Sequence, residues 1–406
     1  MEPVAGVVAE YNPFHCGHAH HLARTREALP GAAVVCAMSG HVTQRGQFAL
    51  CEKHARARMA VAGGADLVLE LPAVCACASA ERFARAGVAL LAATGVVTHL
   101  SFGSEAGTLA PLREAARAMA DPDFLTQVKA QLRRGLSHAA ACQQAYEAHI
   151  GRPAPFLRAP NNILGLEYLK ALHALGDPFI PLTVPRLGAD HDDPRPRAPF
   201  ASASLLRNRL SGGLSAAGLF PPSAQAVWEA ECAAGRAPMR EAAWADMCLS
   251  HLRRLDAADF ARLPDVTEGL EFRLASAARR AATMEAFYRL VATRRYTLAR
   301  VRRVALCAFL GLTPGSDIPP YLRVLAAGPR GLALLRRMKQ TASQPILVKP
   351  ASARTLDPGA VRCFAQEVRV TDLFALGYPN PACRAGGGEW TTGPVIHSAV
   401  HPHQKR

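Results

Sequence analysis

The chain has 406 residues, of which 50% are hydrophobic and 19% are charged, and its formal net charge is +15. This composition supplies enough apolar material for two or three domains and excludes a wholly disordered protein. Its longest apolar stretches, such as residues 86–97, are shorter than the roughly 18 residues that a membrane span requires. Glu2 stands where a signal peptide would begin with basic residues, so we expect no signal peptide and a cytoplasmic protein.

The positive charge is concentrated in the second half of the chain. Residues 1–211 carry 21 basic and 17 acidic side chains, a net charge of +4. Residues 212–406 carry 26 basic and 15 acidic side chains, a net charge of +11. Such an excess is typical of proteins that bind an anionic partner, most often nucleic acid.

The eleven cysteines do not have the spacing of a disulfide framework or of a structural zinc site. No C-x-x-C motif occurs, and Cys75 and Cys77 are separated by a single residue. Most of the cysteines lie in apolar stretches. We therefore expect buried, reduced thiols of the kind found in cytoplasmic proteins.

Strand-like and helix-like segments alternate at the start of the chain. We expect strands at 4–9, 32–38, 65–71 and 97–102 and helices at 18–28, 52–62 and 79–93. The strands are almost continuously apolar, as in a parallel sheet that helices cover on both faces. The pattern predicts an α/β fold with a Rossmann-like, doubly wound parallel sheet.

The remainder of the chain is mostly helical by its pattern. After a largely helical stretch at 107–175, we expect a strand at 178–185, a loop at 188–200 and a helix at 202–210. Further helices are expected at 224–234, 244–255, 270–289, 298–310 and 320–336, with a strand at 346–348. Gly and Pro residues near 211–222 mark a boundary. We therefore predict an α/β domain at 1–212, a helical basic domain at 213–345 and a mixed tail at 346–406 that packs on the rest.

A histidine pair follows the first strand, in the segment E-Y-N-P-F-H-C-G-H that ends at His18. Open parallel sheets bind ligands at the carboxyl ends of their strands, and the free N–H groups of a following helix favour phosphate. Gly17 lets a nucleotide approach the backbone, and His15 and His18 project from one side, one helical turn apart. Two such imidazoles can donate hydrogen bonds to an α-phosphate whose charge changes in a displacement.

Two other interpretations of these histidines stay open. Clustered histidines in a loop can be ordinary loop residues. His15, His18 and His21 can also bind a metal at i, i+3 and i+6, but no carboxylate or cysteine array accompanies them, and we assign no metal ligands.

A second phosphate element is predicted at the start of the helix at 202–210. The sequence has no G-x-x-x-x-G-K-[ST] loop, so phosphate must be held by histidines, helix termini and arginines. Ser204 and Arg207 lie one turn apart in the segment S-A-S-L-L-R, where they can contact β- and γ-phosphates. The alternative is a plain helix cap with a solvated arginine.

These motifs resemble those of the bacterial tRNA(Met) cytidine acetate ligase family, a branch of the HIGH-type nucleotidyltransferase-like superfamily. The resemblance rests on the histidine segment and on further matching segments in the same order along the chain. They are S-G-H-V-T-Q-R-G (39–46), A-D-L-V-L-E-L-P (65–72), F-G-S-E (102–105), P-N-N-I-L-G-L-E-Y (160–168), S-A-S-L-L-R (202–207), D-V-T-E-G-L-E-F-R (265–273) and T-R-R-Y-T-L-A-R-V-R-R (293–303).

The resemblance implies an enzyme that activates acetate with ATP as acetyl-adenylate and then acetylates the exocyclic amine of the wobble cytidine of elongator tRNA(Met). It implies that residues 1–212 form a nucleotidyltransferase-like catalytic domain in which His15 and His18 are catalytic. Mg²⁺ is expected with ATP, and no obligate protein partner is evident. The expected ATP-binding residues are Val8, Ala9, Glu10, Tyr11, Asn12, Pro13, Phe14, His15, Cys16, Gly17, His18, Ala19, His20, His21, Gly103, Asn162, Arg186, Leu187, Ser204 and Arg207.

Three of these contacts also have a plainer interpretation. Gly103 is at the same sheet edge as His15, where a backbone can approach a nucleotide, but it can equally be a turn glycine. Asn162 can contact the adenine or ribose, or merely cap a helix that begins at Ile163. Arg186 can reach a phosphate or form a surface salt bridge.

The basic half of the chain contains a cluster that we assign to tRNA binding. It comprises Arg294, Arg295, Tyr296, Arg300 and Arg303, and a helix places the last two arginines on one face, where they can follow phosphates. A solvated basic face is the alternative.

The chain departs from the family pattern at several positions. Cys16 replaces the usual Asn between the histidines, Gln47 stands where Glu is frequent, and His41 replaces an apolar residue. The alternative functions are a small-molecule adenylyltransferase of the same superfamily and a non-catalytic RNA-binding protein.

Overall fold

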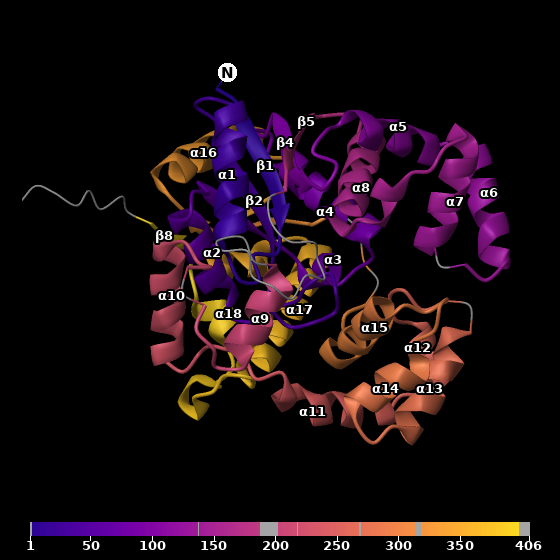
Figure 1. Ribbon diagram of the computed structural model, residues 1–406. Helices are drawn as coiled ribbons and strands as arrows, with labels where there is room; N and C mark the ends of the chain where they lie inside the picture. The colour runs from indigo at the N-terminus through magenta and orange to yellow at the C-terminus, as the bar shows by residue number, and fades with distance from the viewer. Residues whose placement is uncertain are drawn as a thin grey trace, which may run out of the picture.

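The computed structural model describes residues 2–136, 138–186, 202–216, 218–267, 269–313, 315 and 318–397. The predicted loop at 188–200 and the predicted ATP contact Leu187 lie outside these ranges. Within them, eight strands form a sheet in the order β5–β4–β1–β2–β3–β6–β7, and β8 pairs with β6. Helices pack on both sides of this sheet, and a group of helices lies apart from it (Figure 1).

The strands are β1 (Val4–Ala9), β2 (Ala33–Ser39), β3 (Leu67–Leu71), β4 (His99–Ser104), β5 (Ile180–Pro185), β6 (Leu322–Ala327), β7 (Ile346–Leu347) and β8 (Val395–Ile396). The helices of the first part are α1 (Cys16–Ala28), α2 (Lys53–Ala62), α3 (Ala73–Ala76), α4 (Ala80–Ala93), α5 (Ala110–Met119), α6 (Pro122–Arg133), α7 (His138–Ile150), α8 (Pro160–Ala174) and α9 (Ala203–Ser211). Those of the second part are α10 (Pro222–Ala233), α11 (Ala242–Arg253), α12 (Ala257–Ala261), α13 (Leu270–Arg280), α14 (Met284–Val291), α15 (Leu298–Leu310), α16 (Pro329–Thr341), α17 (Pro358–Ala375) and α18 (Gly388–Thr391).

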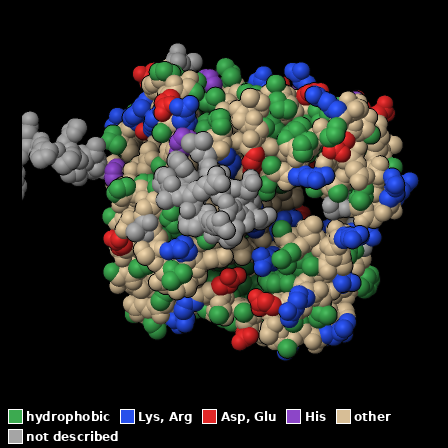
Figure 2. All heavy atoms as spheres, viewed as in Figure 1, with side chains coloured by type: hydrophobic (Ala, Val, Ile, Leu, Met, Phe, Trp, Pro, Cys, Tyr) green, Lys and Arg blue, Asp and Glu red, His purple; other side chains and the backbone are tan. Residues whose placement is uncertain are grey.

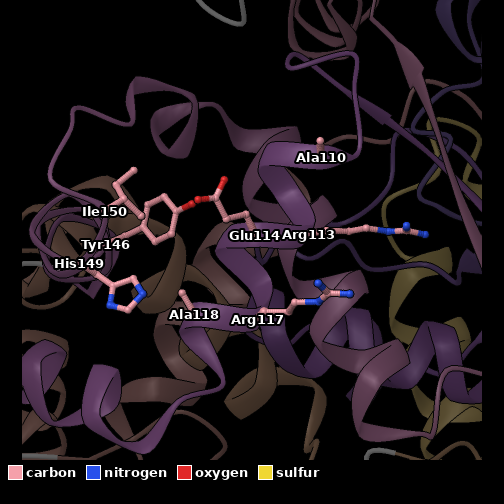
Figure 3. Close-up of a pocket in the computed structure, with 8 residues that line it drawn as sticks. All are labelled: Ala110, Arg113, Glu114, Arg117, Ala118, Tyr146, His149 and Ile150. Carbon is pink, nitrogen blue, oxygen red and sulfur yellow. The ribbon is translucent and has the colours of Figure 1, made fainter.

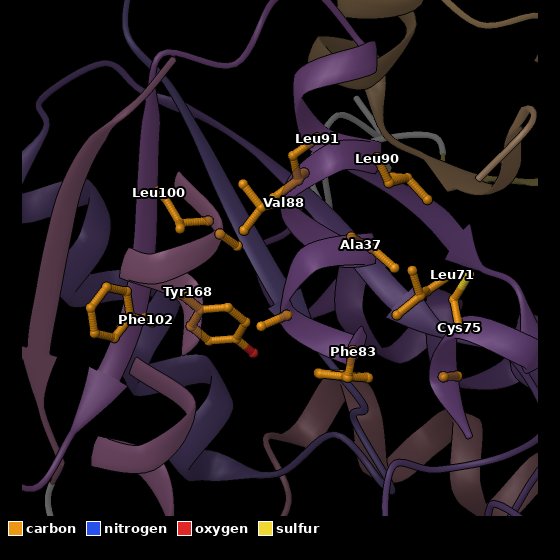
Figure 4. Packing of buried hydrophobic residues seen from close by; sticks show 14 of the residues in the cluster. Ala37, Leu71, Cys75, Phe83, Val88, Leu90, Leu91, Leu100, Phe102 and Tyr168 are labelled. Carbon is orange, nitrogen blue, oxygen red and sulfur yellow. The ribbon is translucent and has the colours of Figure 1, made fainter. Parts of the chain in front are cut away.

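The predicted doubly wound sheet is confirmed. Strands β1 to β5 pair in parallel, and alternate residues of β2 belong to two separate hydrophobic clusters. Val35 and Ala37 pack on the side covered by α4 and α8, whereas Val34 and Cys36 pack on the side covered by α1 and α2. Figure 4 shows the first of these clusters, between the sheet and α4. Burial on both faces explains why the strands are apolar without alternation.

The predicted helix at 320–336 is wrong over its first half. Residues 322–327 instead form β6, which pairs antiparallel with β3, and α16 starts only after Gly328. All six residues of β6 are buried, so the segment has no alternation that distinguishes a strand from a buried helix. β7 confirms the predicted strand near 346, and β8 adds a second C-terminal strand to β6.

The predicted single helix at 270–289 is also wrong, because it is divided into α13 and α14. Ala281 has an extended backbone, and the hydroxyl of Thr283 accepts a hydrogen bond from the backbone N–H of Ala286. Thr283 therefore caps a new helix.

Helices α11 to α15 pack around a hydrophobic cluster of their own, apart from the two sheet clusters. The predicted range 213–345 thus contains both these helices and β6, a strand of the main sheet. The boundaries at 212 and 345 stay a prediction. Each of the eleven cysteines is a free thiol. Among the described helices, none combines the length and the apolar character that crossing a bilayer requires.

Candidate active site

The turn that follows β1 lies where the strand order of the sheet reverses. β1 has β4 on one side and β2 on the other, and open α/β sheets bind ligands at the carboxyl ends of strands at such a point. β1 ends at Ala9 and α1 begins at Cys16, while Gly103 lies near the carboxyl end of β4. The fold therefore brings the predicted segment 8–21 and Gly103 to the same edge.

Two buried residues fix the shape of this turn. Tyr11 has a φ of +45°, in the left-handed region that L residues rarely adopt, and its hydroxyl lies 3.4 Å from Sγ of Cys36. The Tyr11 ring meets the His18 ring edge-on, with 4.8 Å between the ring centroids. The side-chain oxygen of Asn12 accepts a hydrogen bond of 2.7 Å from the N–H of Leu50. Tyr11 thus packs against His18, and Asn12 ties the turn to the loop that precedes α2.

The two predicted catalytic histidines lie against each other. The His15 and His18 rings are stacked, with 3.8 Å between their centroids. Nδ1 of His15 accepts a hydrogen bond from the N–H of Gly17, and Nδ1 of His18 accepts one from the N–H of His15. Because a neutral imidazole carries a single N–H, that proton lies on Nε2 in both rings. The site therefore holds two parallel imidazoles, each with an Nε2–H donor.

Both histidines stay neutral at physiological pH. Burial, followed by the charges of Arg186 and Arg207, lowers the pKa of His15 to about 3. Burial and the neighbouring His15 hold the pKa of His18 well below its usual value. Donors without a charge of their own can bind a phosphate without forming a tight ion pair. Such fixed dipoles can stabilise charge that develops during a reaction.

The predicted second phosphate element reaches the same turn. The hydroxyl of Ser202 accepts from the N–H of Leu205, which confirms the predicted N-cap of α9. One turn on, Arg207 donates to the carbonyl of Asn12 at 3.2 Å and to Oγ of Ser204 at 3.0 Å. The alternative of a solvated Arg207 is therefore wrong. Arg207 instead supplies a fixed positive charge beside the histidine pair.

Arg186 brings a second positive charge to the site from the end of β5. Its guanidinium donates to the side-chain oxygen of Asn161 at 3.3 Å. A Cβ added to Gly103 would lie 3.4 Å from Cγ of Arg186, which is an ordinary contact. A Cβ at position 103 would therefore meet no steric conflict with the described residues of the protein.

The predicted helix cap at Asn162 is wrong. α8 begins at Pro160, and the carboxylate of Glu105 accepts from the N–H groups of Asn161 and Asn162. The buried Asn162 side chain points elsewhere: it accepts from the N–H of Ala106 and donates to the carbonyl of Phe156. Asn162 thus fixes the loop that follows β4.

The other predicted contacts lie around the turn and along α1. The Val8 side chain packs against Gly87 of α4, and Phe14 packs against Gly63 at the end of α2. His21 lies within 3.0 Å of the Ser101 hydroxyl on β4, which ties α1 to the sheet. Ala9, Pro13, Cys16, Ala19 and His20 complete the segment, and the N–H of Cys16 donates to the carbonyl of Leu219.

Sequence reasoning missed a buried arginine on α2 that donates a hydrogen bond to the turn after β1. Arg56 is fully buried and donates to the carbonyls of Glu10 and Cys51 and, through a short contact, of Gly40. Oε1 of Glu10 in turn accepts from the N–H of Gln44 at 2.7 Å. Arg56 therefore joins the carboxyl ends of β1 and β2. α2 also carries a lysine, a histidine and a second arginine, so nothing in the sequence singled out Arg56.

A buried ionic cluster next to the site was missed as well. Nζ of Lys53 lies 2.7 Å from Oε1 of Glu70 on β3 and 2.6 Å from Oε2 of Glu389 on α18, and all three side chains are buried. Nε of Arg323 lies 3.6 Å from the other oxygen of Glu389. His41 is buried nearby, with its ring against Phe374. Glu70 sits within an apolar strand, and such a residue signals a buried partner.

The predicted tRNA-binding residues do not form one exposed face. Arg303 is buried, and its Nε lies 3.0 Å from a carboxylate oxygen of Asp265. Arg300 donates to the carbonyl of Asp265 and to the hydroxyl of Thr267. Arg303 is therefore not exposed to phosphates, whereas tRNA binding by the half-buried Arg300 stays a prediction. Tyr296 is also buried, beneath the guanidinium groups of Arg295 and Arg300, whereas Arg294 and Arg295 are exposed.

The two surface pockets with described linings lie away from the histidine pair. One, of about 510 Å³, lies between α5 and α7 and is lined by Arg117, Tyr146 and His149 among others (Figure 3). The other, of about 560 Å³, lies beside α2 and the C-terminal segment, next to His54 and Glu389. Within the described ranges, no group of three His, Cys, Asp or Glu side chains is placed to hold a metal ion.

Comparison with known proteins agrees with this architecture. The model of the HIGH Nucleotidyl Transferase family matches residues 1–387. The chain is 36% identical over 412 residues to the tRNA(Met) cytidine acetate ligase of Acetivibrio thermocellus, covering 97% of this chain and 99% of the relative. It is 39% identical to the enzyme of that name from Syntrophotalea carbinolica, over 420 residues with the same coverage.

Solved structures of Thermotoga maritima TmcAL are similar over nearly the whole chain. The apo form matches with a TM-score of 0.93 and 30% identity, covering 98% of this chain and 100% of that one. The form bound with alpha-thio ATP matches with a TM-score of 0.90 and 29% identity over the same shares. The chain belongs to the HIGH nucleotidyl transferase family and, within it, to the tRNA(Met) cytidine acetate ligases.

Proposed function

We propose that this protein is an ATP-dependent ligase that activates acetate and transfers the acetyl group to the wobble cytidine of elongator tRNA(Met). The observation that carries the proposal is the stacked His15–His18 pair, with its two Nε2–H donors at the switch point of a nucleotidyltransferase sheet. The names of the relatives support the choice of substrate. A tRNA substrate and the free cysteines are consistent with a cytoplasmic location.

In the first step, a carboxylate oxygen of acetate attacks the α-phosphorus of ATP and forms acetyl-adenylate. The bond between the α-phosphorus and its bridging oxygen to the β-phosphate breaks, and pyrophosphate leaves with the electron pair. The Nε2–H groups of His15 and His18 donate to the α-phosphate oxygens as charge shifts through them. Because both imidazoles are neutral and held in place, they need no rearrangement during the step.

Positive charge for the leaving pyrophosphate comes from Arg207 and Arg186. Arg207 is anchored to the turn through the Asn12 carbonyl, and Arg186 is held by Asn161. Both arginines lie close enough to His15 to depress its pKa. Mg²⁺ is proposed to arrive with ATP and to neutralise the triphosphate; we assign it no protein ligands.

In the second step, the exocyclic amine of cytidine attacks the acetyl carbon of acetyl-adenylate. A C–N bond forms, the bond between that carbon and the adenylate oxygen breaks, and AMP leaves with the electron pair. The amine loses one proton, which passes to solvent or to AMP. The basic helices α11 to α15 are proposed to hold the tRNA, with the exposed Arg294 and Arg295 at its phosphates.

The test supplies purified protein with ATP, magnesium and labelled acetate, and follows the label into bulk bacterial tRNA. Label that enters tRNA only when ATP is present supports the ligase. ATP–pyrophosphate exchange driven by another acid, without label in tRNA, would instead indicate a small-molecule adenylyltransferase. A His18→Ala variant that binds tRNA but transfers no label would place the chemistry at the histidine pair.

A further inference from the structure

Helix α13 carries an aromatic side chain that no other part of the protein covers. Phe272 is 67% exposed, more than any other large apolar side chain in the described ranges. The opposite face of the helix is anchored by Leu270, Leu274 and Ala278, which are buried in the cluster of α11 to α15. Phe272 is therefore presented to solvent on a rigid support, not on a loop.

Arginines lie along α13 and beside its first turn, where Phe272 is located. Arg273 is held next to it by hydrogen bonds to the carbonyls of Val291 and Leu290, at 2.8 and 2.6 Å. Those bonds hold the end of α14 against the first turn of α13. The loop that carries Arg294 and Arg295 follows directly after α14. Arg279, seven residues after Phe272, is exposed on the same side of the helix.

The unit that carries this aromatic has a net positive charge. Residues 253–303 contain twelve arginines and no lysine, against six acidic residues. Figure 2 shows Lys and Arg side chains over the lower right of the molecule, where Figure 1 draws α12 to α14. A surface of this charge repels another basic surface, including a second copy of this chain, and attracts a polyanion.

Unpaired RNA has the two features that this surface complements. Its bases have flat apolar faces that stack on aromatic side chains, and its phosphates are anionic. Tyr296 lies in the same basic unit, but Arg295 and Arg300 cover its ring, so it presents no stacking face. Tyr288 is half-buried with Arg302 over its ring, so Phe272 is, among the described residues of this unit, the aromatic most open to a base.

We propose that Phe272 is a stacking platform for an unpaired base of the tRNA substrate, and that Arg279 and Arg294 hold the neighbouring phosphates. The proposal rests on the proposed tRNA substrate and adds to it the residue that contacts a base. It assigns binding, not chemistry, to α13. Substitutions there should therefore weaken RNA binding without changing acetate activation.

The experiment compares Phe272→Ala, Phe272→Tyr and Ile180→Ala in the full-length protein. Ile180 is a matched control, because it is 61% exposed and lies on β5, away from α13. The dissociation constant is measured for an unmodified elongator tRNA(Met) transcript and for its isolated anticodon stem-loop. Acetate-dependent ATP–pyrophosphate exchange without tRNA reports the first step alone.

We expect Phe272→Ala to weaken tRNA binding about fivefold to a hundredfold, as loss of one stacked base does. Phe272→Tyr and Ile180→Ala should bind like the unchanged protein, and all variants should keep the exchange rate. Equal tRNA affinity for Phe272→Ala and the unchanged protein overturns the proposal. So does sedimentation that shows self-association lost only in Phe272→Ala, since the face would then be a protein interface. If the unchanged protein binds and acetylates no tRNA, the proposed function fails instead.

Discussion

Replacing Lys53 with methionine removes the cation that lies between two buried carboxylates. Nζ of Lys53 is 2.7 and 3.0 Å from the two oxygens of Glu70 and 2.6 Å from Glu389. Burial lowers the pKa of Lys53, but the neighbouring Glu389, Glu70 and Glu367 carboxyls raise it further, to a value above its usual one. The ammonium is therefore charged in the folded protein, and methionine preserves most of its volume but none of its charge.

The expected loss of stability follows from the carboxylates that stay behind. Removing one partner of a buried ion pair costs about 3–5 kcal/mol, because the other charge is left uncompensated. Here two carboxylates lose their shared cation, and of these two it is Glu389 that has Arg323 beside it, at 3.6 Å. We expect Lys53→Met to lower the free energy of unfolding by at least about 3 kcal/mol, a large fraction of the 5–15 kcal/mol typical of a folded protein.

Urea denaturation at pH 7 measures this loss, with Lys129→Met as the control, since Lys129 is exposed on α6. Adding Glu389→Gln to Lys53→Met should restore part of the stability, because the two substitutions remove a shared interaction. The difference in unfolding free energy between the unchanged protein and Lys53→Met should also shrink as the pH falls. Without the ammonium, repulsion raises the folded-state pKa of the remaining carboxyls, so the folded form takes up protons and gains stability in acid. A deficit below about 1 kcal/mol at pH 7, or full additivity of the two substitutions, would refute the reasoning.

Three further predictions concern the histidines and arginines. His18→Ala should lower the rate of acetate-dependent ATP–pyrophosphate exchange about a hundredfold to a thousandfold, because one preorganised hydrogen-bond donor is lost. Its affinity for tRNA should not change. An unchanged exchange rate would show that His18 takes no part in the chemistry. Arg294→Ala should weaken tRNA binding and reduce the slope of log affinity against log salt by about 1. Arg303→Ala should instead lower the free energy of unfolding by about 3 kcal/mol, because it breaks the ion pair with Asp265, and should leave that slope unchanged. His15 has its pKa lowered to about 3, so the unfolded state binds its proton first as the pH falls below about 6.5, and stability should decline from there toward pH 3. His15→Gln should show a shallower decline in denaturation midpoints, and an equal slope would contradict the neutral, buried imidazole.

The sequence was sufficient to predict the first five strands and the histidine site, because both depend on short-range patterns. The first three strands are almost continuously apolar, and the histidines lie one helical turn apart beside a strand end. β6 was not predictable in this way. Leu322–Ala327 contains good helix formers, and only its pairing with β3, far back in the chain, makes it a strand.

The errors at individual side chains have a similar cause. Arg300 and Arg303 do share a helix face, as their spacing predicts, but the spacing cannot show that Asp265 and Thr267 cover that face. Asn162 has the chemistry of a helix cap, yet the carboxylate of Glu105 takes that role from a distant loop. Local patterns identify which residues act together, whereas their partners depend on the tertiary fold.

The joining of the C-terminal segment to the first strands has a consequence for how this enzyme is made. The carboxylate of Glu367 accepts a hydrogen bond from the N–H of Ala73, 294 residues earlier in the chain, and β8 closes onto β6 beside β3. While the chain emerges from the ribosome, β3 is an open edge until β6 has been synthesised, and part of β6 is an open edge until β8 has. The ammonium of Lys53 also lacks one of its two carboxylates until Glu389 has been synthesised. An open edge strand is a site for wrong pairing between chains. A premature stop shortly before residue 389 removes both β8 and Glu389, and we expect it to yield aggregate rather than a weakly active enzyme.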